Sequence, residues 1–147
     1  MLFRPALLAD KQGLQALVDN SPGIQVFDEI AAQLEELVRL ARPSQRLSPE
    51  AAQEAVQQQL GGVAPADYGV WVYYPWSNRL VHLLDEAEFV AVRTDRNRNK
   101  ITREEQERLA RLKVGVIGLS VGQSVSLTMA SERSFGEIRL ADFDRLD

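Results

Sequence analysis

The sequence contains no cysteine and only one histidine among its 147 residues. The lack of cysteine excludes a disulfide framework, a thiolate zinc site and a cysteine nucleophile within these residues. No run of apolar residues approaches the roughly 18 to 20 that a membrane-spanning helix needs, and the first residues lack the basic cluster and long apolar core of a secretory signal. We therefore expect a cytoplasmic protein with no membrane partner.

The sequence also has no excess of positive charge. Seventeen lysines and arginines stand against 21 acidic residues, a net charge of -4, whereas nucleic-acid binders usually carry a basic surface. We expect no nucleic-acid partner. A local exception is a group of four cations with one acid among them, a pattern that most often marks a solvated loop: Arg93, Asp95, Arg96, Arg98 and Lys100. The 45% apolar and 26% charged residues are typical of a folded globular domain.

Up to about residue 60, the pattern predicts helices separated by breakers. One stripe of apolar residues recurs at steps of three and four, and Pro43 must end the helix that carries it; its members are Phe27, Ile30, Leu34, Leu37, Val38 and Ala41. A second helix begins at Ser48-Pro49, because serine caps free amides and proline fits the first turn. It ends at Gly61-Gly62.

From Tyr68 the pattern changes to short segments rich in β-branched and aromatic residues. Three of them, Val70–Tyr74, Leu80–Leu84 and Phe89–Val92, predict a small antiparallel meander. Its aromatic side chains either form a recognition surface or, as is commoner, pack in a core against the helices. His82 lies inside an apolar run without an acidic or hydroxyl neighbour, which favours a packed core or edge residue over a catalyst.

The last third predicts a strand, a crossover helix and a second strand. Thr102 and Glu105 form a capping-box pattern that opens a helix running to about Leu112. A continuous apolar strand follows at 113–117, then a helix at about 122–133 and a strand at 137–141. The predicted fold class is α/β: an N-terminal α+β domain at 1–100, followed at 101–147 by the first β-α-β unit of a Rossmann-like ATP-binding fold.

The turn between this first strand and its helix is the segment with a chemical signature. Small residues there allow close approach of a pyrophosphate, and the free amides and dipole of the first helical turn attract anions. Asp142 falls at the carboxyl end of the next strand, where an acid can accept hydrogen bonds from ribose hydroxyls, and Asp144 follows it. The pattern therefore predicts a nucleotide site, and Asp142 alone suits NAD as well as ATP.

The same turn also fits the Gly-x-Ser-x-Gly nucleophile elbow of α/β-hydrolases, with Ser120 as the nucleophile. Two features of the chain argue against it. Helices and a meander, rather than several core strands, precede the turn. The triad order of that fold also requires a histidine after the serine, whereas His82 comes before it.

From Thr94 to Asp147 the chain resembles the ThiF/MoeB/HesA adenylyltransferases, which are related to the activating enzymes of ubiquitin-like proteins. A helix with Gln106-Glu107-x-Leu109 leads into the first strand, as in that family. The family's Gly-x-Gly-Gly-x-Gly-Ser turn falls without gaps on 118–124, and its Asp-x-Asp falls on Asp142-Phe143-Asp144. The double acid is the most specific feature. An N-terminal addition like residues 1–100 is similar to the branch described as ThiF-like or MoeY-like, from molybdopterin cofactor biosynthesis.

The resemblance implies ATP-dependent adenylylation of a carboxylate, either the C-terminus of a ubiquitin-like sulfur-carrier protein or a small acid. ATP and magnesium are the implied cofactors and a homodimer the implied assembly. In that family the turn matching Gly118, Ser120, Gly122 and Ser124 holds the phosphates, the position of Asp142 holds the ribose, and that of Asp144 lies near the phosphates. An arginine comparable to Arg96 or Arg98 stabilises the leaving pyrophosphate, often across a dimer interface.

The chain departs from the family pattern in its turn and in its extent. Ser120, Val121 and Gln123 stand where the family has glycines, which makes the turn less permissive for close phosphate approach. The family's Asn-x-x-Arg motif and later site residues have no counterpart before Asp147, so we expect an N-terminal segment of a longer protein that is inactive alone. Two rival hypotheses stay open: a partner-binding module with a degenerate nucleotide fold, and an NAD-dependent oxidoreductase.

Overall fold

The computed structural model describes residues 1–144, apart from the side chain of Arg98. The chain folds with both helices and strands and divides into two compact units, Met1–Val92 and Arg93–Asp147. The division lies at 92/93 rather than near residue 100, so the cation-rich segment before residue 101 groups with the second unit.

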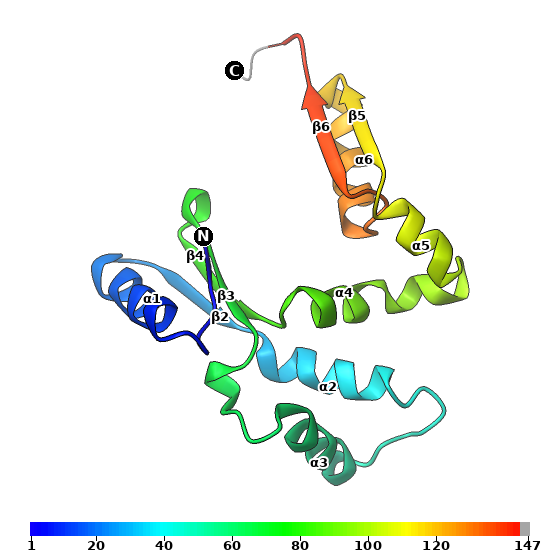
Figure 1. Ribbon diagram of the computed structural model, residues 1–147. Coiled ribbons are helices and arrows are strands. Elements are labelled where there is room, and N and C mark those ends of the chain that lie inside the picture. Colours follow the sequence, from blue (N-terminus) through cyan, green and yellow to red (C-terminus); the bar gives the residue numbers. More distant parts are fainter. Residues whose placement is uncertain (145–147) are drawn as a thin grey trace. The chain divides into compact units, whose positions relative to one another are not determined.

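A four-stranded sheet organises the first unit (Figure 1). Its strands are β1 (Leu2–Phe3), β2 (Gln25–Asp28), β3 (Val70–Tyr74) and β4 (Arg79–Leu83), in the order β1-β3-β4-β2. β3 pairs antiparallel with both β1 and β4, whereas β2 pairs parallel with β4. The sheet is therefore mixed. Of the antiparallel meander predicted from the sequence, only the pairing of β3 with β4 is confirmed.

The third strand of the predicted meander is wrong. Residues 89–92 lie in α4 (Glu86–Thr94), a helix with acidic residues in its first turn. Phe89 and Val92, three residues apart, both pack against the buried cluster that contains Leu84. A spacing of three places both side chains on one face of a helix, and this packing decides the conformation of a run too short to distinguish helix from strand.

The helices of the first unit follow the predicted breakers with one exception. α2 (Ile30–Leu40) carries the apolar stripe, but Phe27 is not part of it, because this residue lies in β2. α3 (Pro49–Leu60) is capped by the Ser48 side chain and ends at Gly61, whose φ is 58°. α1 (Leu8–Asn20) joins β1 to β2, and the short helix η1 (Pro65–Asp67) precedes β3.

The core of the first unit lies where α2, α3 and the end of β4 meet. Ile30, Leu34, Leu60 and Leu84 are each at most 3% exposed, and α4 packs against them through Phe89 and Val92. The half-buried Tyr68 joins the same cluster just before β3. This core uses the apolar stripe that the sequence predicts for α2.

The second unit contains a strand, a helix and a parallel strand. The short helix η3 (Asp95–Asn99) and α5 (Arg103–Leu109) precede β5 (Lys113–Ile117), α6 (Leu119–Ser131) and β6 (Glu137–Ala141). β5 and β6 pair in parallel register from Lys113–Glu137 to Ile117–Ala141. The capping box of Thr102 and Glu105 is confirmed. α6 begins at Leu119, three residues before its predicted start.

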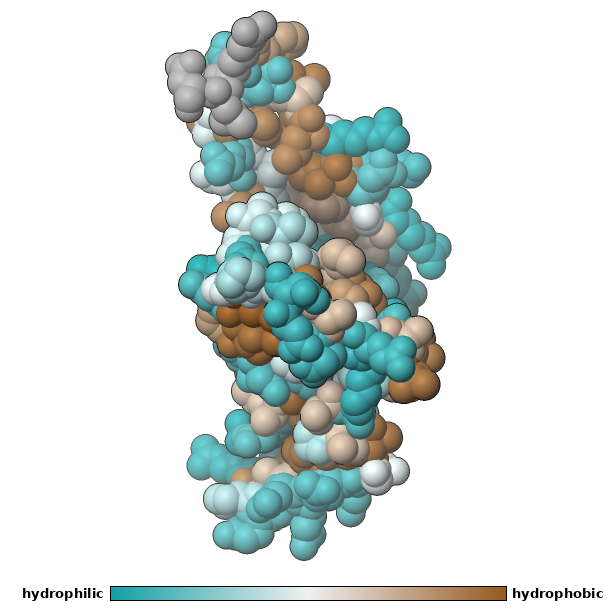
Figure 2. Space-filling view, turned by 90° about the vertical axis from the view of Figure 1, so that its left-hand side faces the viewer, coloured by the Kyte–Doolittle hydropathy of each residue, from teal (hydrophilic) through white to brown (hydrophobic). Residues whose placement is uncertain are grey.

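Much of the apolar surface of the second unit is exposed. Brown patches in the upper part of Figure 2 belong to this unit. The exposed residues come from both strands, from α6 and from the segment after β6: Ile117, Val121, Leu127, Leu140 and Phe143, each between 51% and 92% exposed. The two parallel strands carry apolar residues on both faces, a pattern typical of strands buried on both sides. A single helix can cover only one face of the pair, so the other face stays exposed.

Candidate functional site

The candidate site is the tip where β5 passes into α6. Gly118 stands at the N-cap with φ 86° and ψ 105°, a conformation that favours glycine, and it carries no side chain that could cap the helix. Its amide donates to the carbonyl of Ala141 at 2.9 Å, which fixes the turn to the end of β6. The first amides of α6, beginning with Leu119, have no intrahelical acceptor and therefore point out of the tip.

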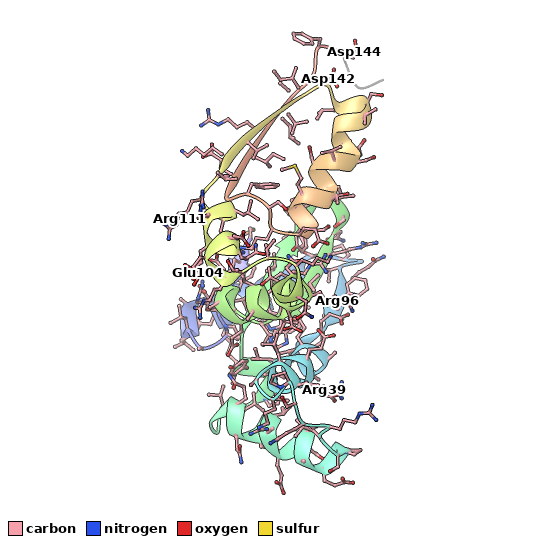
Figure 3. The ribbon with its side chains drawn as sticks, turned by 90° about the vertical axis from the view of Figure 1, so that its right-hand side faces the viewer. Arg39, Arg96, Glu104, Arg111, Asp142 and Asp144 are labelled. Atoms are coloured by element: carbon pink, nitrogen blue, oxygen red, sulfur yellow. The ribbon has the colours of Figure 1, made fainter. Side chains whose placement is uncertain are left out.

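Asp142 lies at this tip, directly after β6. Its Oδ2 accepts from the amide of Leu119 at 2.5 Å, and its Oδ1 accepts from the amide of Asp144 at 3.1 Å. These backbone donors, Asp144 first and Leu119 second, hold the pKa of the exposed Asp142 carboxyl below its usual range. Figure 3 shows Asp142 and Asp144 together at the end of the strands. The Asp142 carboxylate and the Gly118 turn are distant in sequence but lie together at one exposed end of the β5–β6 strand pair.

The carboxylate of Asp142 occupies part of the region expected to bind phosphate. A helix N-terminus carries partial positive charge, and Asp142 satisfies the first of its free amides. An incoming phosphate would compete with this carboxylate for the Leu119 amide. A ribose, by contrast, would donate hydrogen bonds to the carboxylate. Asp142 would therefore compete with the phosphates of a nucleotide but bind its ribose.

Gly122 has a packing role at the start of α6. A Cβ on Gly122 would come within 2.8 Å of Val116 Cγ1, so the missing side chain lets α6 lie close against β5. Helix–strand packing of this kind is one of the glycine roles in dinucleotide-binding turns. Gly118 supplies another, the tight turn.

The two serines predicted to hold phosphate lie at different distances from the tip. Ser120 is exposed in the first turn of α6, adjacent to Leu119. Ser124 is exposed one turn further along, and its carbonyl accepts from the Thr128 hydroxyl at 2.9 Å. Ser120 is thus at the tip, whereas Ser124 is about 9 Å along the helix from Gly118.

The predicted arginines lie at the other end of the β-α-β unit. Asn97 of η3 donates to the carbonyl of Glu132, and Gln106 of α5 donates to the carbonyl of Arg133, so both elements pack where α6 ends. The 13 residues of α6 separate that end from Asp142 by about 20 Å. Arg96 is exposed there, far from Asp142 in Figure 3, and is not brought to the tip of its own chain. The side chain of Arg98 lies outside the described residues.

His82 has partners that sequence reasoning missed. The ring is fully buried, with Nδ1 2.9 Å from Asp28 Oδ1 and Nε2 2.7 Å from the carbonyl oxygen of Tyr68. Asp28 lies in β2, too far along the chain for local spacing to reveal it. Because both ring nitrogens are engaged, His82 is not available as a base for Ser120, and the hydrolase hypothesis loses its histidine within this chain.

Residues 1–144 contain no helix with the length and apolarity required to cross a bilayer. Within the same range there is also no group of three or more histidine, cysteine, aspartate or glutamate side chains placed to hold a metal ion.

Comparison with known proteins gives one informative match. The chain is 39% identical over 128 residues to the uncharacterized protein MT1398 of Mycobacterium tuberculosis (strain CDC 1551 / Oshkosh). The match covers 87% of this chain but 16% of the relative, so the chain spans about a sixth of that protein's length. No family model and no solved structure matches.

Proposed function

We propose that the β5–α6 tip binds ATP and that this chain is part of an adenylyltransferase that activates a carboxylate. The observation that carries the proposal is the contact of Asp142 Oδ2 with the Leu119 amide, 2.5 Å apart. It brings an acid suited to ribose hydroxyls and a glycine turn suited to phosphates to one edge of a parallel strand pair. The resemblance of residues 94–147 to the ThiF/MoeB/HesA enzymes supplies the reaction.

Each residue at the tip has a defined task in this proposal. The amides of the first turn of α6, from Leu119 onward, donate to the phosphate oxygens, and Gly118 lets the backbone turn without a side chain in the way. Asp142 exchanges its bond to the Leu119 amide for ribose hydroxyls. Mg²⁺ is usually bound by one or two carboxylates together with substrate phosphates, and we propose this role for Asp144.

The proposed reaction transfers the adenylyl group of ATP to a carboxylate and releases pyrophosphate. The tip contributes orientation and charge stabilisation, with no covalent intermediate on these residues. Because Arg96 lies at the far end of α6, this arginine would reach the pyrophosphate only from a second copy of the chain. The proposal therefore includes a homodimer, with a ubiquitin-like sulfur-carrier protein or a small acid as the carboxylate substrate.

Calorimetric titration of the chain with ATP·Mg, NAD and inorganic pyrophosphate tests the proposal. We expect heat with ATP·Mg and none with NAD. Binding of NAD alone would favour the oxidoreductase, and the absence of binding by either nucleotide would favour a partner-binding module.

Asp142→Ala distinguishes the contribution of the ribose to binding from that of the phosphates. Loss of the ribose acceptor should weaken ATP binding about tenfold or more. The same change should leave pyrophosphate binding unchanged or tighter, because the carboxylate no longer competes for the Leu119 amide. Asp142→Asn, which keeps an acceptor oxygen for that amide, is the control for the fold of the turn. Equal ATP affinity in the wild type and Asp142→Ala would contradict the assignment.

A further inference from the structure

The proposed nucleotide site makes no use of the open edge of the sheet in the first unit. β2 stands at the end of the strand order β1-β3-β4-β2, so it pairs with a strand on one side only. All four of its residues are exposed, among them Val26 at 52% and Phe27 at 40%. An edge strand offers unpaired backbone groups to another strand, which makes β2 a candidate interaction surface.

The backbone hydrogen bonds of β2 show which of its groups face the open side. On the β4 side, the amide of Gln25 donates to the carbonyl just before β4 at 3.0 Å, and that of Glu29 donates to a β4 carbonyl at 3.2 Å. Residues alternate between the two sides of a strand, so Phe27 also faces β4. The amides and carbonyls of Val26 and Asp28 therefore point to the open side.

A row of apolar side chains ends at the same edge. The strand registers align one residue from each strand across one face of the sheet: Leu2, Val72, Val81 and Phe27. Leu2 is 49% exposed at one end of the row, and Phe27 is 40% exposed at the other. Arg79, on the same face of β4, lies with its guanidinium carbon 5.7 Å from the centroid of the Phe27 ring. The edge thus carries an aromatic ring with a cation beside it.

We propose that β2 pairs with β2 of a second copy of the chain, antiparallel and about a two-fold axis at Phe27. In this register Val26 lies opposite Asp28 of the second copy, and Gln25 lies opposite Glu29. The groups that face the open side are those of Val26 and Asp28, so each of the two Val26–Asp28 pairs exchanges two backbone hydrogen bonds. The pairing joins the two four-stranded sheets into one.

The match of this edge to itself favours a second copy over an unrelated segment. Phe27 meets its own counterpart, so the apolar row continues across the axis and both rings lose exposed surface. Arg79 Nε lies 3.4 Å from Gln25 Oε1, and Gln25 lies opposite the exposed Glu29 of the second copy. A positive and a negative side chain therefore approach each other from the two chains, and no directly opposed positions carry like charges.

The length of the strand sets the strength of the pairing. β2 ends at Asp28, and α2 begins at Ile30, so the contact extends over few residues of each chain. Permanent dimers bury much larger surfaces than such a contact provides. We therefore expect a reversible dimer whose fraction rises with protein concentration.

Hydrogen exchange followed by NMR at several protein concentrations tests the pairing directly. In the dimer the amides of Val26 and Asp28 bond to the second copy, whereas the Phe27 amide faces β4 at every concentration. We expect the protection of Val26 and Asp28 to rise in parallel with the dimer fraction from sedimentation velocity. The protection of Phe27 should stay constant.

Val26→Pro removes an amide from the open side of β2. Proline is tolerated in an edge strand where its nitrogen faces away from the sheet, so β2 should keep its bonds to β4. The dissociation constant of the dimer should rise about tenfold or more. Val26→Thr, which keeps the amide, should dimerise like the wild type. Melting curves from tryptophan fluorescence establish that the first unit is folded in both variants.

Charge reversal tests the contact between Arg79 and Glu29 without a change in the backbone. Glu29→Arg and Arg79→Glu each bring like charges together, so each should raise the dissociation constant about threefold or more. The double variant restores an opposite pair and should return toward the wild type. These variants decide the proposal if Val26→Pro does not fold.

A wild-type chain that stays monomeric at millimolar concentration would overturn the proposal. A dimer that Val26→Pro and the charge reversals leave unchanged would also overturn it, because its contact lies elsewhere. Protected Val26 and Asp28 amides in a monomer would show that another segment of the chain covers the edge, and unprotected amides in a dimer would show an edge open to a different protein; both results contradict the pairing. No nucleotide is present in these measurements, so their outcome leaves the ATP-binding proposal unaffected.

Discussion

At the scale of single residues, Asp142 is the residue on which the account of the nucleotide site depends. Asp142 is exposed, yet its carboxylate accepts hydrogen bonds from the backbone amides of Leu119 and Asp144. Sequence reasoning predicted that this acid lies beside the turn, because parallel strands end at the same edge of a sheet. It did not predict that the acid itself bonds to the first amide of α6.

The lowered pKa of Asp142 leads to a prediction at Leu119. Proline is tolerated at the first position of a helix, so Leu119→Pro removes the amide donor and keeps α6. The pKa of the Asp142 carboxyl should then rise toward its usual range, as followed by ¹³C NMR of the carboxyl carbon. Leu119→Ala, which keeps the amide, should titrate like the wild type.

The sign of the related stability effect is fixed by the direction of the shift. Because folding lowers the pKa of Asp142, its contribution to stability is present above the usual pKa of aspartate and is lost as the pH falls through the lowered value. Identical carboxyl titrations in Leu119→Pro and Leu119→Ala would show that the amide does not hold the carboxylate in solution.

At the scale of elements, the sequence predicts those whose ends carry local signals. Ser48-Pro49 and Gly61 bound α3, and Thr102 with Glu105 opens α5, as expected from capping chemistry. The apolar strands β5 and β6 were also predicted at their observed bounds.

Elements decided by distant contacts were not predicted. β2 takes its conformation from pairing with β4, so Phe27 was assigned to a helix by its spacing alone. Residues 89–92 have the composition of a strand but form a helix because Phe89 and Val92 pack on the α2–α3 core. The Asp28–His82 contact likewise depends on strand pairing and leaves no signal in either local segment.

The cap of α3 can be tested in isolation from packing. The Ser48 hydroxyl oxygen accepts from the amide of Ala51 at 3.2 Å, and the side chain is exposed. Ser48→Ala should destabilise the first unit by about 0.5–2 kcal/mol, measured by urea unfolding with tryptophan fluorescence. Ser48→Asn, which keeps an acceptor at this position, should stay close to the wild type. An unchanged midpoint in Ser48→Ala would show that the cap does not stabilise α3.

At the scale of the whole molecule, burial is distributed unequally between the two units. All ten buried hydrophobic residues among those described lie in the first unit, between Phe3 and Leu84. The second unit buries Asn97 and Ser126 and exposes much of its apolar surface. The relative MT1398 is far longer than this chain, and the match covers 16% of it, so the complete activity is a proposal for the longer protein.

This inequality predicts different local stabilities. Native-state hydrogen exchange should show amides of β3 and β4 protected more strongly than those of β5 and β6, because few apolar contacts oppose opening in the second unit. Equal protection in the two sheets would mean that burial in the first unit does not set the local stability.

The central claim is that the tip between β5 and α6 binds the phosphates of ATP. The most direct test is titration of the ¹⁵N-labelled chain with ATP·Mg while all backbone amides are observed by NMR. We predict saturable shifts concentrated at Gly118, Leu119, Ser120 and Asp142, with no such response to NAD. Saturable shifts confined to other segments, or the absence of any shift at the tip, would contradict the account.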